Sequence, residues 1–374
     1  MAKKKAHYEV VFMPWADLHK EYEVGPFCIV PWKKMAVRNK AVKQFLDRYF
    51  ERHIDHFGKA VDGIAVLVVD RSFAPVPRHV VGKARAAIDM FIFATIAPGV
   101  VAAVRSGQRN LAPPTADAYQ LVLQKFDPSD DTIAVTVGGT TNAGRLGNMM
   151  IHKPWDVGGS CGFPDDGLLQ GLGHLLKGRV KANVRKRLSR SLEWFRLAHV
   201  TGDGASLFTK AVMMSTAFEI LFQIPDGPGK TSKFIDAVEA QVKRTDTVSD
   251  TRTITRGART WTRTHSLPGW WADDFYDLRS RVVHGDPVEI ERLRYKRWVS
   301  HLIVADVVFW QSMVEQLYSL RCFGADLRRM SREYDRMCPD KQPGWHEQEL
   351  KDWLLGFDDV SRSLGWRPKK NGKK

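Results

Sequence analysis

The chain has 374 residues, of which 44% are hydrophobic and 26% are charged, as is ordinary for a folded soluble protein of two or three domains. The formal net charge of +15 indicates a polyanionic partner, with nucleic acid ahead of an acidic membrane surface. A basic surface that serves only solubility is the alternative. The four cysteines are scattered and form no C-x-x-C pair, which argues against structural zinc and indicates reduced thiols in a cytoplasm.

The first half of the chain has segments typical of strands. Three apolar, β-branched runs have strand length: 8–12, 64–69 and 132–137. Helices are predicted at 41–57 and at about 83–96. The inner stripe of the first helix is predicted to be Phe45, Leu46, Tyr49 and Phe50. The uncharged segment 90–104 is too short to span a bilayer and contains Pro98-Gly99, so we expect a buried helix followed by a turn.

From about Lys181 onward the apolar residues recur at helical spacing. Helices are predicted at 184–199, 207–222 and 270–283, and the longest is expected to begin after Pro287 and reach Leu317. The chain is therefore predicted to have an α+β fold. Its expected parts are a mixed, strand-rich domain (1–176), an all-α helical bundle (177–330) and a helical extension with a basic tail (331–374).

The predicted helix at 270–283 ends in a run with a distinctive pair of residues, Arg279 and His284. Two side chains five positions apart lie about 140° apart around a straight helix. Gly285 can adopt a left-handed C′ conformation and Pro287 stops the helix, so His284 is expected in the last turn or at the cap. An arginine can bind a phosphate and a histidine can transfer a proton near neutral pH. The alternative is an Arg-His pair that only caps a helix.

The segment Tyr276–Gly285 resembles the RxxxxH signature of HEPN-domain ribonucleases, most closely the Apea-like branch. Two more segments carry the resemblance: Arg190–Phe195 on the first helix and Ala217–Phe222 on the second. Where many HEPN proteins have Asn, Asp or His after the arginine, this chain has Ser280, as in Apea-like members. The resemblance implies a dimer in which two motif helices form one composite site. It also implies a sensing or regulatory role for the domain at 1–176.

Arginine recurs between residues 252 and 263, just before the motif helix. A loop that binds along a nucleic-acid strand typically has cations that bind phosphates, a tryptophan on which bases stack, and hydroxyls that form hydrogen bonds. A disordered basic loop is an equal alternative. The residues expected to bind substrate are Ser280, Arg281, Arg256, Arg259, Trp261 and Arg263.

Several other patterns are weaker. The segment 139–146 has the glycine spacing of a P-loop, but Arg145 and Leu146 replace the required Lys and Ser or Thr, so we reject a nucleotide site. The acid pairs Asp165-Asp166 and Asp273-Asp274 lack the partners that a metal site needs. Asp277 is expected to pair with Arg281 rather than to orient His284.

These patterns predict a cytoplasmic, metal-independent endoribonuclease without cofactors. Arg279 and His284 are the expected catalytic residues, the 2′-OH of RNA is the nucleophile, and RNA is the partner rather than a membrane. The HEPN resemblance implies a toxic effector in antiphage defence. The alternative is a non-catalytic HEPN module for nucleic-acid binding or dimerisation. We expect a homodimer whose interface is formed by Phe275, Leu278, Val282, Phe309 and Trp310.

Overall fold

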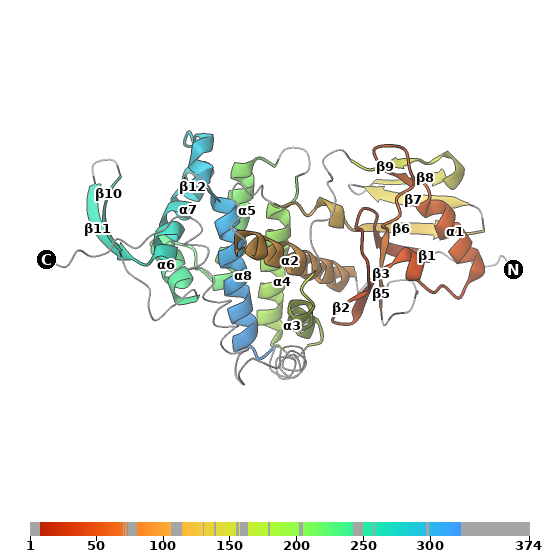
Figure 1. Ribbon diagram of the computed structural model, residues 1–374, viewed down its shortest axis with the longest axis horizontal. Coiled ribbons are helices and arrows are strands. Elements are labelled where there is room, and N and C mark those ends of the chain that lie inside the picture. Colours follow the sequence, from red (N-terminus) through yellow and green to blue (C-terminus); the bar gives the residue numbers. More distant parts are fainter. Residues whose placement is uncertain are drawn as a thin grey trace. The chain divides into compact units, whose positions relative to one another are not determined.

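The computed structural model describes residues 8–322 apart from 70, 72, 74–80, 106–113, 130, 138–139, 155–156, 158–163, 179, 202–204, 242–249, 257–258 and 297–298. The chain forms two compact units. The first comprises residues 1–96, 115–185 and 199–204, and the second comprises 97–114, 186–198 and 205–374. The sheet belongs to the first unit and a group of helices to the second, so the fold is α+β (Figure 1). The domain boundaries near 176 and 330 stay predictions, and the expected extension at 331–374 lies outside the described residues.

A seven-stranded antiparallel sheet organises the first unit, with the order β2-β3-β5-β1-β6-β7-β8. Its strands are β1 (Tyr8–Met13), β2 (Tyr22–Val24), β3 (Phe27–Pro31), β5 (Ala65–Val69), β6 (Val122–Asp127), β7 (Thr132–Val137) and β8 (Thr140–Arg145). The three predicted strands are confirmed as β1, β5 and β7. The strand β8 occupies most of the glycine-containing segment 139–146, which a phosphate-binding loop cannot do. A parallel pair of two-residue strands, β4 (His53–Ile54) and β9 (Ile151–His152), lies outside this sheet.

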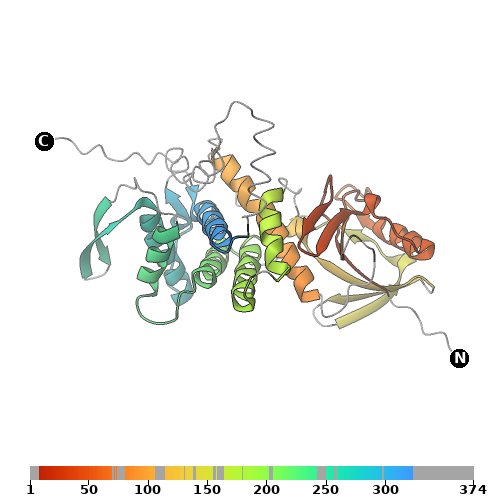
Figure 2. The same ribbon diagram turned by 90° about the horizontal axis from the view of Figure 1, so that it is seen from below.

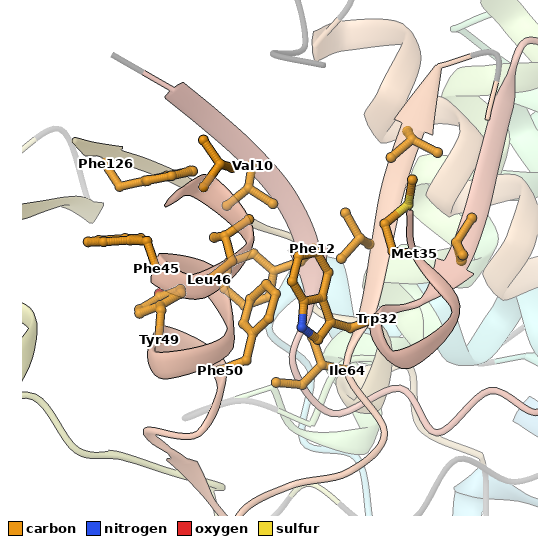
Figure 3. Close-up of a cluster of buried hydrophobic side chains, with 14 of the residues drawn as sticks. Val10, Phe12, Trp32, Met35, Phe45, Leu46, Tyr49, Phe50, Ile64 and Phe126 are labelled. Atoms are coloured by element: carbon orange, nitrogen blue, oxygen red, sulfur yellow. The ribbon is translucent and has the colours of Figure 1, made fainter. Parts of the chain in front are cut away.

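Helix α1 (Lys40–Phe50) covers the sheet and completes the core of the first unit. Asn39 caps its start by accepting hydrogen bonds from the backbone N–H groups of Ala41 and Val42. The predicted inner stripe is confirmed, and Figure 3 shows these side chains in one cluster with Val10, Phe12 and Phe126 of the sheet. The rings of Phe45 and Phe126 stack with centroids 4.9 Å apart. The predicted end of the helix at residue 57 is wrong, because the chain leaves the helix after Phe50 and forms β4.

Helix α2 (Val81–Arg105) contributes residues to both units, and α3 (Asp166–Leu176) follows in the first. The predicted break at Pro98-Gly99 is wrong, because α2 continues through Pro98 to Arg105. The α2 segment Gly82–Val101 is long and apolar enough to cross a membrane, but 78% of it is buried inside the protein. Among the described residues it is the one such segment, and its burial fits the core helix of a soluble protein.

The second unit is a group of helices around an aromatic core. Its helices are α4 (Ala182–Ala198, which begins in the first unit), α5 (Leu207–Phe222), α6 (Lys230–Gln241), α7 (Leu267–His284) and α8 (His301–Ser319). Phe218 of α5 lies at the centre, with its ring 5.6 Å from Phe234 of α6 and 5.2 Å from Phe309 of α8. The helices predicted at 184–199, 207–222 and 270–283 are confirmed.

Three features of this unit differ from the prediction. Helix α6 was not predicted. The helix expected after Pro287 begins only at His301, and the intervening chain forms a short 3-10 turn, η5 (Ile290–Leu293), and the pair β12 (Arg294–Lys296) and β13 (Val299–Ser300). The third feature is an antiparallel hairpin formed by β10 (Asp250–Arg256) and β11 (Arg259–His265), which projects beyond the helices of the unit in both views (Figures 1 and 2).

Candidate functional site

Helix α7 carries both expected catalytic residues, and local sequence fixes its two ends. Ser266 accepts a hydrogen bond from the backbone N–H of Gly269, and Pro268 occupies the first turn, where its missing N–H has no consequence. At the other end Gly285 has a φ of +76°, the left-handed conformation that closes a helix. The backbone N–H of Asp286 then bonds to the carbonyl of Arg281 at 3.0 Å. His284 is therefore the last helical residue, as predicted.

Arg279 and His284 do not meet within one chain. Arg279 lies on the side of α7 that faces α5, with 20% of its side chain exposed, whereas His284 is exposed to solvent. For this pair of described residues the structure records neither a hydrogen bond nor an ion contact. The two residues make no contact because five helical positions separate them by about 140° around α7 and by about 7.5 Å along it. The two side chains of one chain are therefore directed to different sides of α7.

Glu219 of α5 holds Arg279 in place. The Glu219 Oε1 atom lies 3.4 Å from Nη2 of Arg279 and accepts a hydrogen bond of 2.8 Å from the hydroxyl of Tyr276. The other oxygen, Oε2, lies 2.8 Å from Nζ of Lys230. Only 13% of the Glu219 side chain is exposed, so this carboxylate connects three helices in a partly buried cluster that we call the Glu219 cluster.

The protonation states of Tyr276 and Lys230 favour their contacts with Glu219. Burial raises the pKa of Tyr276 well above its usual value, and the hydrogen bond to Glu219 adds to this effect. Burial disfavours the charged form of Lys230, but hydrogen bonds to Glu219 and Asp226 outweigh burial and raise its pKa. Tyr276 thus stays a hydrogen-bond donor and Lys230 stays a cation at neutral pH.

Arg279 retains unused hydrogen-bonding capacity. A guanidinium has five N–H donors, and the described residues supply Arg279 with one ion contact, to Glu219. The Nε atom is buried and has no partner among the described residues. The guanidinium carbon lies 5.4 Å from the centre of the Tyr276 ring, so the ring supports one face of the group. The side chain is therefore positioned but can still bind an anion.

We expect Glu219→Ala to destabilise the protein by about 1–3 kcal/mol, because the partly buried Arg279 and Lys230 lose their shared carboxylate. The shift of the urea unfolding midpoint measures this effect. Asp226→Ala is the matched control, since Asp226 also pairs with Lys230 but its side chain is fully exposed. Its midpoint should stay unchanged. Equal shifts for the two variants would show that the Glu219 cluster has no special role.

Near Arg279, the charged side chains of α7 form ion pairs that do not include Arg279. The Arg281 Nε lies 3.2 Å from Oδ2 of Asp277, which confirms the predicted pair. Arg292 also contacts Asp277 at 3.2 Å and Asp274 at 3.4 Å. Ser280 is half-buried and Arg281 is exposed. The contact with Asp277 uses only Nε of Arg281, so its terminal nitrogens remain available to substrate.

The predicted loop at 252–263 is wrong, because these residues form the β10–β11 hairpin. Arg263 lies 5.5 Å from the ring of Trp261 and 3.5 Å from Oδ1 of Asp273, in the first half of α7. Arg256 and Arg259 pair in register next to the turn, and their side chains lie outside the described ones. The hairpin is thus tied to α7, but Trp261 is already covered by Arg263.

The paired acids contact cations of the protein. Asp273 contacts Arg263, and Asp274 contacts Arg292 as well as Nε2 of the buried His301, at 3.3 Å. In the described part of the chain, no three His, Cys, Asp or Glu side chains gather as metal ligands would. The cations are sufficient to explain why these two carboxylates lie together.

Models of known protein families, curated proteins and solved structures give no match to this chain. Sequence reasoning missed Lys230 and gave no role to Glu219, although Glu219 lies in the segment 217–222. A glutamate within an apolar helix was the one signal of its role, because a partly buried carboxylate needs cationic or hydrogen-bonding partners.

Proposed function

We propose that the chain is a metal-independent endoribonuclease of the HEPN type. One observation carries the proposal: Glu219 and Tyr276 fix Arg279, which keeps free donors, on the helix that ends at the exposed His284. A fixed cation and an exposed proton carrier are the groups that phosphodiester transfer requires. In this proposal the helices of the second unit form a HEPN-type bundle, and the N-terminal domain has a sensing or regulatory role.

The reaction uses the 2′-hydroxyl of RNA as its nucleophile. The 2′-oxygen forms a bond to phosphorus as its proton passes to a base, and the bond from phosphorus to the 5′-oxygen breaks as that oxygen takes up a proton. His284 of one copy accepts the first proton or supplies the second, and Arg279 stabilises the charge on the phosphorane. The products are a 2′,3′-cyclic phosphate and a 5′-hydroxyl.

The separation of Arg279 from His284 supports a dimer as the active form. Two copies of α7 related by a twofold axis bring the His284 of one chain toward the Arg279 of the other. Such a pair also supplies both a base and an acid. The HEPN resemblance further supports a cytoplasmic toxic effector in antiphage defence, in which the nuclease acts on RNA once it is triggered.

A second candidate is a non-catalytic HEPN module that binds nucleic acid or dimerises. The ion contact between Arg279 and Glu219 favours this non-catalytic module, because an arginine with a purely structural role would also pair with a partly buried carboxylate. The two functions differ in one measurement, which is whether the purified protein converts RNA into products.

We expect RNA cleavage to continue in excess EDTA and to leave 2′,3′-cyclic phosphate ends. An oligonucleotide with a single 2′-deoxy sugar at the cleaved position should resist cleavage there, because the nucleophile is missing. Electrophoresis and mass spectrometry of the products test both points. Cleavage that stops in EDTA and returns with magnesium, or that proceeds at the 2′-deoxy position, would contradict the proposed chemistry.

A further inference from the structure

The β10–β11 hairpin has one face made only of threonine. Side chains of a strand alternate between faces, and in this hairpin every second residue of both strands is threonine. The register aligns them as three cross-strand pairs: Thr251 with Thr264, Thr253 with Thr262, and Thr255 with Thr260. All six are exposed. We call these six residues the threonine face.

The opposite face holds the hairpin against α7. Arg252 lies 4.6 Å from the centre of the Trp270 ring, and Arg263 contacts Asp273. At the base, Glu239 of α6 accepts hydrogen bonds from the backbone N–H and the hydroxyl of Ser266, at 2.7 and 2.6 Å. The threonine face is therefore directed away from these contacts, on a hairpin whose orientation relative to α7 is fixed.

The threonine face presents a regular array of hydroxyls. The hydroxyls of Thr251 and Thr264 are 2.8 Å apart, and those of Thr255 and Thr260 are 3.1 Å apart. A hydroxyl has one donor and two acceptor positions, so each keeps capacity after this contact. Successive pairs repeat at about 6.6–6.8 Å along the strands. The array is thus narrow, and its hydroxyls can both donate and accept hydrogen bonds.

Charge and composition select the partner of the threonine face. The segment 250–265 contains four arginines and one aspartate, so a second copy of the hairpin would be repelled and a polyanion attracted. The face has no aromatic side chain on which an unpaired base could stack, since Trp261 lies on the opposite face under Arg263. A polyanion whose bases are already stacked on each other, a duplex, fits these properties.

We propose that the threonine face docks in the minor groove of double-stranded RNA. That groove is wide and shallow and displays 2′-hydroxyls, which donate and accept hydrogen bonds as threonine hydroxyls do. A two-stranded ribbon can lie in it, and the net positive charge of the hairpin attracts the phosphates that border the groove. The proposal deepens the proposed function: the substrate would be an RNA whose duplex region binds the hairpin while a neighbouring segment reaches α7.

Binding to the full chain that carries His284→Ala tests the docking without cleavage. Fluorescence anisotropy is measured with an RNA duplex longer than the ~16 base pairs that a double-stranded RNA-binding domain spans, with a DNA duplex of the same sequence, and with single-stranded RNA. We expect the RNA duplex to bind about tenfold more tightly than either of the others. Equal affinities for the three would overturn the proposal.

Replacing all six threonines with valine removes the hydroxyls but keeps the β-branched shape, and should lower affinity for the RNA duplex about tenfold. Serine at the same six positions is the matched control and should bind like the parent. Unchanged binding by a folded valine variant would overturn the docking. If the valine variant does not fold, a 2′-O-methylated RNA duplex tested on the His284→Ala chain takes its place, since the added methyl groups block the groove. Equal binding of methylated and unmethylated duplexes would likewise overturn it.

The outcomes for docking and for cleavage are separate. A chain that binds duplex RNA through the threonine hydroxyls but never cleaves RNA would refute the proposed nuclease and leave the docking in place. A chain that cleaves RNA with His284 and Arg279 while the valine variant binds duplex normally would refute only the docking.

Discussion

His284→Ala is expected to lower the rate of RNA cleavage by about 10²–10⁴-fold, the usual contribution of a general acid or base. The side chain is exposed at the last position of α7, so its removal should leave the unfolding midpoint unchanged. Gel-based cleavage rates and urea titrations measure the two effects. His152→Ala, at an exposed histidine of the first unit, is the matched control and should cleave like the parent. A His284→Ala variant as fast as the parent would remove His284 from the mechanism.

Arg279→Lys should lower the same rate by about 10²-fold, because an ammonium keeps the charge but loses the planar fork that stabilises a phosphorane. Lysine can still pair with Glu219, so this variant separates the catalytic role of Arg279 from its structural one. Full activity in Arg279→Lys would indicate that Arg279 only supports the helix contact. That outcome would favour the non-catalytic module.

The end of α7 was predictable because its signals are local. Gly285 and Pro287 specify where the helix stops, and Arg281 is four positions after its partner Asp277. The contact of Arg279 with Glu219 joins residues 60 positions apart on two helices, and no periodicity reveals such a contact. Sequence reasoning could therefore place the candidate residues on α7, but it could not establish which of them are already paired.

The hairpin was missed for a different reason. A strand is usually recognised by alternation of apolar and polar residues, and this hairpin alternates threonine with arginine and has few apolar side chains. The residue types of the hairpin do alternate with a period of two, but the alternation is not between apolar and polar side chains. In α2 the opposite applies: Pro98 is a strong local stop signal, yet the buried apolar surroundings of the helix outweigh it.

The expected dimer interface also needs correction. Phe275, Leu278 and Phe309 are fully buried within their own chain, and Trp310 is 3% exposed. These side chains form the core of the second unit, so they cannot also contact a partner. Val282 is half-buried. Near His284 the exposed apolar side chains are Val283, with 48% of its surface exposed, and Ile290, with 62%. They are the better candidates for a surface that two copies share.

We therefore expect Val283→Asp combined with Ile290→Asp to dissociate the proposed dimer and to lower cleavage by at least about 10²-fold. A twofold axis near His284 would bring the new carboxylates of both copies together in an apolar contact, where their charges repel and lose hydration. Light scattering measures the mass, and cleavage is assayed at the same protein concentrations.

Leu207→Asp is the matched control for the double variant. Leu207 is also an exposed apolar residue, at 39%, but it starts α5, about 18 Å along that helix from Glu219 and its contact with Arg279. This variant should stay dimeric and active. A parent protein that is monomeric throughout its active range, or a monomeric double variant that cleaves normally, would contradict the composite site. Since Arg279 and His284 face different directions on one α7, either result would require the reaction to use only one of them.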